Sequence, residues 1–267
     1  MRISVDHRAT YRFSDPQARI VQLLRLRPSD TGGQTVVDWR IDVDCDARLR
    51  PALDGFGNEV TMLYADGPID RLELTVSGEV LTMDTSGVLH GAREPLPPML
   101  FLRTTPRTTP GGELRFFAHE AMAGAADALG ALHCLNTALF ERFDAVPLGR
   151  DRGFSAGAAF ALEALCPRER AHVFLAAARG AGLPARYVAG YRQQDGGDAS
   201  MPHAWAEAHV DGLGWIAFDP SAGICADEHY VRVAVGLDSP GAAMVTGLRT
   251  GAGEEELALD VHVERVE

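Results

Sequence analysis

The apolar residues of the first ninety positions alternate with polar ones, and this period of two constrains the fold more than any other feature of the chain. Successive side chains of a strand point to opposite faces, so each alternating row marks a strand with one buried face. Several such runs, separated by Asp-Gly and Gly-Asn turns, predict an antiparallel β-sandwich in residues 1–95. The rows of one parity are Ile3, Val5, Ala9, Tyr11 and Phe13, then Val37, Trp39, Ile41, Val43 and Cys45, and later Leu72, Leu74 and Val76.

A proline-rich stretch follows the alternating region. Residues 91–112 contain five prolines and end in two glycines. Proline fixes φ and lacks a backbone donor, so such a density of prolines is typical of a linker. We therefore expect a domain boundary here, between residues 1–95 and residues 113–267.

Beyond the linker the apolar spacing becomes helical. Leu129, Leu132, Leu135 and Leu139 recur at three- and four-residue intervals, which indicates a helix with one buried stripe within residues 116–143. Further helices are predicted over 156–165 and from Pro167 to the glycines near 180. Strands are predicted over 186–191, 203–210, 215–218 and 230–235, with a last alternating run over 257–263. Helices followed by antiparallel strands make the second region an α+β domain.

The composition excludes several classes of partner. The net charge of −12 opposes binding to nucleic acid and to anionic lipid, because both require clustered cations. No stretch approaches the roughly 20 apolar residues of a membrane-spanning helix, and the first residues already alternate like a strand. We therefore expect a cytoplasmic protein. Its four scattered cysteines should be reduced thiols, with no metal site and no cofactor. These are Cys45, Cys134, Cys166 and Cys225.

The most informative segment is a predicted hairpin that contains a histidine and an aspartate. The run from residue 203 to 210 alternates, and a second apolar run ends at Asp219. An antiparallel return can bring Asp219 beside His203. An aspartate that orients a histidine forms two-thirds of a nucleophile-activating triad. Strand parity places four side chains on one face of the first strand, namely His203, Trp205, Glu207 and His209.

Four motifs around this pair occur in a fixed order. They are residues 183–191 (LPARYVAGY), 203–207 (HAWAE), 214–220 (GWIAFDP) and 229–236 (HYVRVAVG). With residues 24–28 and 54–58 nearer the start, they make nearly the whole chain similar to the bacterial transglutaminase-like family. The resemblance implies a β-sandwich followed by a papain-like α+β domain with a Cys-His-Asp triad. His203 and Asp219 fall on the family's histidine and aspartate.

The sequence departs from the family pattern at the nucleophile. The family has Cys-x-Asp-x-Ala-His at the start of a helix, whereas residues 165–172 read LCPRERAH. Ungapped alignment places Pro167 at the nucleophile position and Glu169 at the aspartate. Proline supplies neither a thiol nor an N–H group. Cys166 lies one residue early, at the expected N-cap, so only a local bulge would bring its sulfur toward His203.

Two functions remain open at this stage. The first is a degenerate member whose cleft binds a peptide or protein partner without cutting it. The second is an active cysteine amidase or peptidase that uses Cys166, His203 and Asp219 on a peptide or protein amide. A zinc site built from Cys166, His203, Glu207 and His209 is a minor alternative because no close ligand pair supports it. Cys225, in a loop after Asp219, is a possible substitute thiol on the wrong element.

Overall fold

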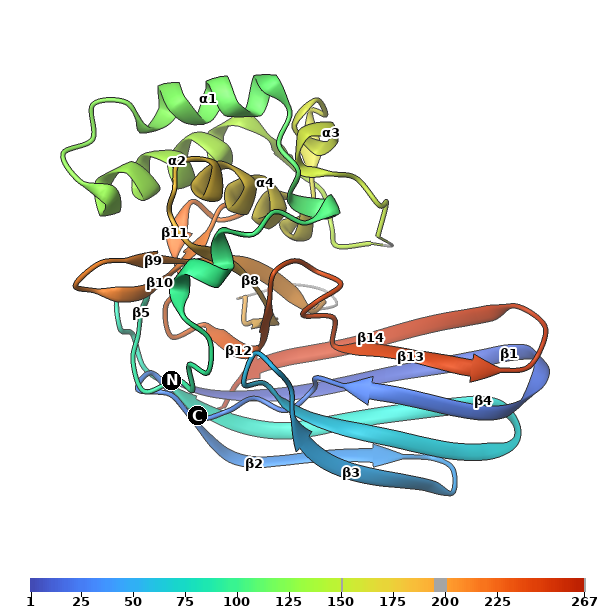
Figure 1. Ribbon diagram of the computed structural model, residues 1–267. Helices are drawn as coiled ribbons and strands as arrows, with labels where there is room; N and C mark the ends of the chain where they lie inside the picture. The colour runs from blue at the N-terminus through green and yellow to red at the C-terminus, as the bar shows by residue number, and fades with distance from the viewer. Residues whose placement is uncertain (150, 195–200, 267) are drawn as a thin grey trace.

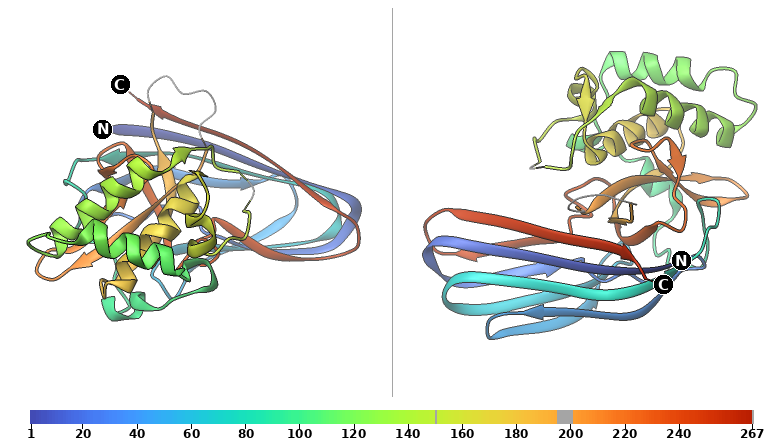
Figure 2. Two further views of the ribbon diagram at one scale, coloured as in Figure 1. Left: turned by 90° about the horizontal axis from the view of Figure 1, so that it is seen from above. Right: turned by 180° about the vertical axis from the view of Figure 1, so that it is seen from behind.

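The computed structural model describes residues 1–149, 151–194 and 201–266 of the chain. It contains two antiparallel sheets of six strands each and a set of helices (Figure 1). The helices lie on one side of the second sheet, and the first sheet lies on the other (Figure 2). The predicted α+β class, with a β-sandwich ahead of a papain-like domain, is confirmed. The predicted loop over 193–200 falls mainly outside the described residues.

The first sheet is built on two long strands that run through both layers of a sandwich. It contains β1 (Arg2–Leu24), β2 (Gln34–Val43), β3 (Ala47–Leu53), β4 (Glu59–Thr82), β13 (Val245–Thr250) and β14 (Glu255–Arg265). The first half of β1 pairs with β14 and its second half pairs with β13. Both halves also pair with β4, with register shifts between Arg12 and Arg19. Side chains from both halves, such as Val5 and Leu24, belong to one hydrophobic core. The two halves therefore face each other across the sandwich.

The last two strands of the chain return to this first sheet. Ile3 of β1 lies opposite Arg265 of β14, so the two ends of the chain are neighbours (Figure 1). The domain boundaries expected from the sequence placed residues 245–265 in the second region. The structure shows that these residues pair with β1 of the first sheet. Alternation identified a strand at 257–263, in which Val261 and Val263 are buried, but it could not identify the strand that pairs with it.

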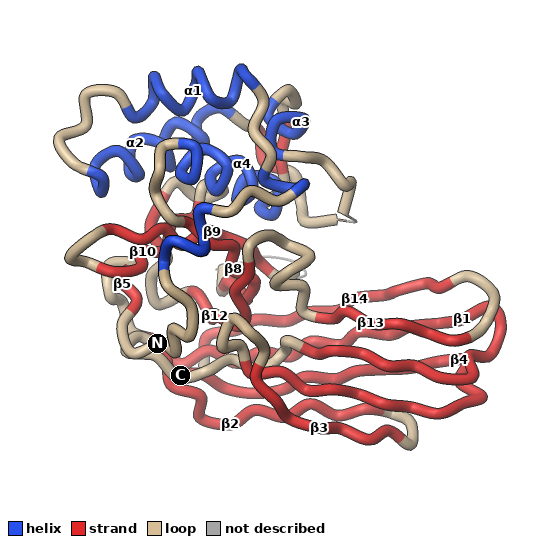
Figure 3. Tube along the Cα trace, viewed as in Figure 1, coloured by secondary structure: helices blue, strands red, loops and turns tan. Residues whose placement is uncertain are grey.

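The second sheet carries the helices. Its strands are β5 (Val88–Leu89), β8 (Ala185–Arg192), β9 (His203–Val210), β10 (Gly214–Asp219), β11 (Ile224–Cys225) and β12 (Tyr230–Gly236). The α-helices are α1 (Gly112–Met122), α2 (Ala128–Arg142), α3 (Ala156–Phe160) and α4 (Pro167–Gly180). They gather together above this sheet (Figure 3). Helix α4 packs on β8 and β9, and Phe174 stacks on Phe218 with ring centroids 5.4 Å apart.

Three local expectations differ from the structure. The helical run 116–143 is two helices, separated at Gly124, whose φ of +80° favours glycine. The helix expected over 156–165 ends at Phe160, because residues 164–165 form β7 (Ala164–Leu165) and pair in parallel with β6 (Asp144–Ala145). The proline-rich linker is packed, with short 3₁₀ helices at η1 (Pro98–Leu102) and η2 (Pro106–Thr108). Phe101 of η1 is buried 5.1 Å from the Trp215 ring.

The two regions pack against each other along β8 and β12. Tyr191 of β8 lies in the sandwich core, and its hydroxyl hydrogen-bonds to His7 Nδ1 at 2.8 Å. Asn58 exchanges two hydrogen bonds of 2.8 Å with the backbone of Val235 in β12. These contacts fix the position of the sandwich against the second sheet. Within the described ranges, no helix is long and apolar enough to span a membrane.

Candidate functional site

The site begins with the hydrogen bond between His203 and Asp219. His203 opens β9 and Asp219 closes β10, and these neighbouring strands are antiparallel. His203 Nε2 lies 2.7 Å from Asp219 Oδ2, which confirms the predicted contact. Because Nε2 faces the carboxylate, Nδ1 is the ring nitrogen that faces away from it. A histidine held in this way can accept a proton at Nδ1 while the carboxylate stabilises the imidazolium.

Asp219 is fully buried and accepts several hydrogen bonds besides that of His203. The backbone N–H and hydroxyl of Ser221 donate to Oδ1 at 2.8 and 2.6 Å, and the Tyr230 hydroxyl donates to Oδ2 at 2.7 Å. Burial alone would raise the pKa of this carboxyl. The charge of His203 and these donors outweigh burial and hold the pKa well below its usual range. Asp219 is therefore ionised throughout the neutral range.

Aromatic rings fix the orientation of the His203 imidazole. The ring stacks on Trp205 at a centroid distance of 6.1 Å and an interplanar angle of 25°. It meets Tyr230 edge-on at 5.8 Å. His203 is only 8% exposed. The imidazole is thus held by its neighbours in one orientation, which a base in a catalytic triad and a rigid binding group both require.

His203 lines a cavity of 310 Å³ between the second sheet and the sandwich, called the His203 cavity below. Its wall on the sandwich side comes from β1 and β14, and the β14 part of that wall is apolar. Leu257 and Leu259 are 46% and 41% exposed there, although both are large and apolar. Arg168, Asp151 and Tyr187 add polar groups to the opposite wall. The other lining residues are His7, Ala9, Tyr11, Leu148, Ala189, Pro202, Ala204, Ser239, Pro240, Ala242, Ala243, Met244 and Val245.

Cys166 is placed differently from the other two predicted site residues. It is the N-cap of α4, with φ −78° and ψ 165°, and Pro167 takes the first helical position. It is 6% exposed and does not line the His203 cavity. Within the described residues its sulfur makes no hydrogen bond to His203. Among the described residues, a hydrogen bond therefore joins His203 to Asp219, and none joins Cys166 to either of them.

The surroundings of Cys166 stabilise the start of the helix rather than a thiolate. Glu169 Oε2 accepts a hydrogen bond from the Cys166 N–H at 3.1 Å, as in a capping box. Arg152 binds the same carboxylate, with Nε 2.7 Å from Oε1. Burial raises the pKa of the Cys166 thiol. A hydrogen bond from the Glu169 backbone N–H partly offsets the rise, and the Glu169 charge adds to it. A thiol with a raised pKa is a poor nucleophile at neutral pH.

The minor alternatives lose their support. The carboxylate of Glu207 is bound by Arg186 at 2.6 Å and by Arg232 at 2.7 Å, so guanidinium groups occupy the oxygens that a zinc ion would need. Its pKa is lowered to about 2, because the two arginines outweigh the effect of burial. Cys225 lies in β11 opposite Phe218, and burial raises the pKa of its thiol to about 11.

The sequence patterns did not identify several residues that surround His203 and Asp219. Ser221 and Tyr230 both donate to Asp219, yet only Asp219 itself was predicted. Ser221 follows the motif's Asp-Pro pair and could have been read as a turn residue that bonds back to the aspartate. Leu257 and Leu259 were predicted as part of a strand, but nothing in that row indicated that they face His203.

The chain is similar to known proteins in both sequence and structure. Residues 3–81 match the family described as the bacterial transglutaminase-like N-terminal region, and residues 115–220 match the transglutaminase-like superfamily. An uncharacterized protein of Mycobacterium leprae (strain TN) is 25% identical, over 99% of both chains. A crystal structure of a candidate cysteine protease from Cytophaga hutchinsonii superposes with a TM-score of 0.79. It shares 17% identity over 100% of this chain and 91% of that chain, a likeness that shows the fold alone.

Proposed function

We propose that this chain, a member of the transglutaminase-like superfamily, uses its His203 cavity to bind a peptide or protein segment without cleaving it. The observation that carries the proposal is Pro167 at the first position of α4, where the family has its cysteine. Proline offers no thiol and no N–H group. Both the attacking atom and one donor to a developing oxyanion are therefore missing from the helix end.

The residue before it does not replace what is lost. The Cys166 N–H donates to Glu169, so this second backbone donor is also engaged. The Cys166 thiol is buried, its pKa is raised, and it lies outside the lining of the His203 cavity. An attack on an amide needs a thiolate in contact with the histidine. None of these features supports such an attack.

The His203 cavity has the properties of a binding site for an extended segment. One wall carries half-exposed leucines from β14, and the other carries His203, Arg168 and Tyr187. Sites of this kind bury an apolar side chain and use a few polar groups to fix its orientation. The wall contributed by Leu257 and Leu259 would receive the apolar side chain, and His203 would hydrogen-bond the backbone of the bound segment.

Alkylation kinetics test the absence of a reactive thiol. We expect iodoacetamide to modify Cys166 more slowly than the exposed Cys134 at pH 6 and at pH 8, because Cys166 is buried with a raised pKa. Peptide mapping by mass spectrometry measures both sites in one sample, so Cys134 is the internal reference. His203→Ala should leave the Cys166 rate unchanged.

The second candidate is an active cysteine amidase or peptidase with Cys166 as nucleophile, His203 as base and Asp219 as orienting group. The intact His203–Asp219 hydrogen bond of 2.7 Å favours it. Its signature in the same experiment is rapid labelling of Cys166 at pH 6 that is lost in His203→Ala. That result would reject the non-catalytic proposal.

A further inference from the structure

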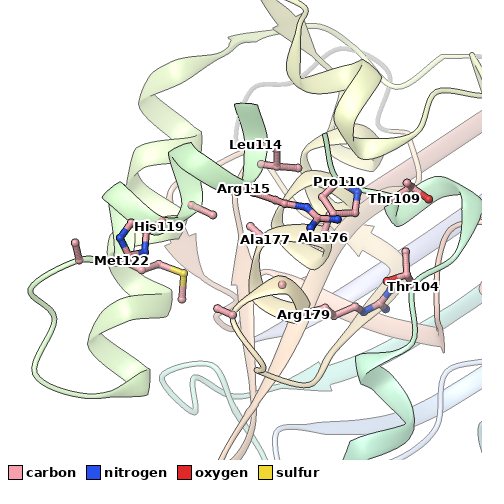
Figure 4. A pocket seen from close by; sticks show the side chains of 14 residues that line it. Thr104, Thr109, Pro110, Leu114, Arg115, His119, Met122, Ala176, Ala177 and Arg179 are labelled. Atoms are coloured by element: carbon pink, nitrogen blue, oxygen red, sulfur yellow. The ribbon is translucent and has the colours of Figure 1, made fainter. Parts of the chain in front are cut away.

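A second cavity lies away from His203, under α1 (Figure 4). It has a volume of 570 Å³ and is bounded by α1, the last turns of α4 and residues 104–110; we call it the α1–α4 cavity. Pockets that hold small molecules are commonly of this size. It is lined by Thr104, Thr109, Pro110, Leu114, Arg115, Ala118, His119, Met122, Ala123, Ala176, Ala177, Arg179, Gly180 and Ala181.

The ionisable side chains that line this cavity are all basic. Arg115 and His119 come from α1 and Arg179 comes from α4, and their side chains are drawn in Figure 4. No aspartate or glutamate occurs among its described lining residues. The chain as a whole carries a net charge of −12, so a cavity whose ionisable lining groups are all basic differs in sign from the overall charge. This local excess of positive charge attracts anions.

Arg179 provides a buried positive charge that makes no ion pair among the described residues. It is 7% exposed, and its guanidinium donates to the carbonyls of Ala185 and Leu237 and to the hydroxyl of Thr108. These are neutral acceptors, and the described part of the chain gives Arg179 no ion pair. Burial lowers its pKa to about 10. The charge of Asp238 opposes this effect of burial but does not cancel it. A buried charge without an ion pair is costly, and a bound anion nearby would offset part of that cost.

Arg115 provides a second charge whose donors are available. It is exposed on α1, and among the described residues it has no ion pair or side-chain hydrogen bond. Its planar guanidinium can bind a carboxylate with two parallel hydrogen bonds. The rest of the wall is apolar and comes from Leu114, Ala118, Met122 and the alanines of α4. The cavity thus combines a cationic part with an apolar part.

We propose that the α1–α4 cavity binds a small amphipathic carboxylate, whose head group contacts Arg115 near Arg179 and whose apolar tail lies against Leu114, Ala118 and Met122. This site is separate from the His203 cavity, and the two share no lining residue. The proposal does not depend on the function proposed for His203.

Methyl NMR can locate the bound molecule. Sodium octanoate is titrated into the full chain labelled with [methyl-¹³C]methionine, because Met122 lines the α1–α4 cavity and Met244 lines the His203 cavity. We expect a saturable shift of the Met122 methyl signal while the Met244 signal stays in place. A shift of Met244 with Met122 unmoved, or no saturable shift at Met122, overturns the proposal.

Two comparisons test the role of charge. Arg115→Met should weaken octanoate binding about tenfold, because hydrogen bonds between charged groups are the strong ones. Arg48→Met is the matched control: this arginine is exposed on β3, has no ion pair among the described residues, and its replacement should change nothing. The neutral analogue 1-octanol should bind about tenfold more weakly than octanoate. Equal binding of the alcohol, or equal loss in both variants, rejects an anion site.

Discussion

The triad region has two parts that differ in their contacts. The strand end is formed by His203 and Asp219, and the helix end is formed by Cys166 and Pro167 at the start of α4. At the strand end, Asp219 binds His203, Ser221 and Tyr230 and is fully buried. At the helix end, where the family has its nucleophile, Pro167 opens α4 and Glu169 caps it. His203 and Asp219 make the hydrogen bond expected of a triad, whereas the residues at the start of α4 make the contacts of a capped helix.

The difference indicates which part of the triad region also supports the fold. A buried carboxylate with several donors cannot be removed without leaving those donors unsatisfied. A cysteine at the N-terminus of a helix has no comparable structural duty, and proline at the first helical position is compatible with the helix. Under the non-catalytic function proposed above, the His203–Asp219 pair would be retained because it stabilises the fold. Three changes test this contrast.

The largest effect is expected at the strand end. Asp219→Ala leaves the imidazole and two hydroxyl groups without their acceptor, so the free energy of unfolding should fall by about 3 kcal/mol or more. Urea denaturation followed by tryptophan fluorescence measures the change. Asp211→Ala, an exposed aspartate at the turn of the same hairpin, should cost no more than about 0.5 kcal/mol. Similar losses in both variants would contradict a structural role for Asp219.

An intermediate effect is expected when the nucleophile is restored. In Pro167→Cys, His203 and the helix N-terminus should lower the pKa of the new thiol to roughly 6. Its thiolate fraction at pH 6 then exceeds that of an ordinary cysteine by about 100-fold, and the lower basicity removes about tenfold of its nucleophilicity. We expect iodoacetamide to label it about tenfold faster than Cys134 at pH 6. Labelling that stays slow, or persists in a double variant with His203→Ala, would show that the helix end is not aligned with His203.

The smallest effect is expected from the helix cap. Glu169→Gln removes the charge that Arg152 and the Cys166 N–H bind, and should cost about 1 kcal/mol at pH 7. Burial opposes the charge of Glu169, but these donors outweigh it and lower its pKa in the folded chain. The charge therefore adds stability above the unfolded pKa of about 4.3, and that stability is lost as the pH falls through the folded value. Urea unfolding at pH 7 and pH 3 measures both. The exposed Glu163→Gln should show no pH-dependent difference from the unmodified chain.

The sequence was most informative where spacing is local. Strand parity and one tight return were enough to place His203 beside Asp219, because the partners are sixteen residues apart on adjacent strands. The departure at Pro167 could be located because Ala171 and His172 fix the alignment around it. The preference of Pro167 for a first helical position also predicted Cys166 as the N-cap.

Non-local pairing could not be predicted in the same way. The alternating row that contains Leu257 and Leu259 is compatible with any sheet that needs an edge strand, and only packing selects β1. The run 161–165 is rich in good helix formers, yet Ala164 pairs with Asp144 instead. Here tertiary contacts override a weak local preference. The α1–α4 cavity likewise depends on how α1 lies over α4, and the spacing of apolar residues in the sequence does not predict that arrangement.

The pairing of β14 with β1 also determines the order in which this protein can be completed. During synthesis β1 emerges before β14, so this edge of the sandwich can form only after more than two hundred residues of intervening chain have been made. Contacts so distant in sequence slow folding, because a long loop must close before they form. Leu257 and Leu259 belong to β14, so the apolar wall of the His203 cavity forms only after β14 has been synthesised. A nascent chain that already holds the His203–Asp219 pair still lacks the surface against which a segment would bind.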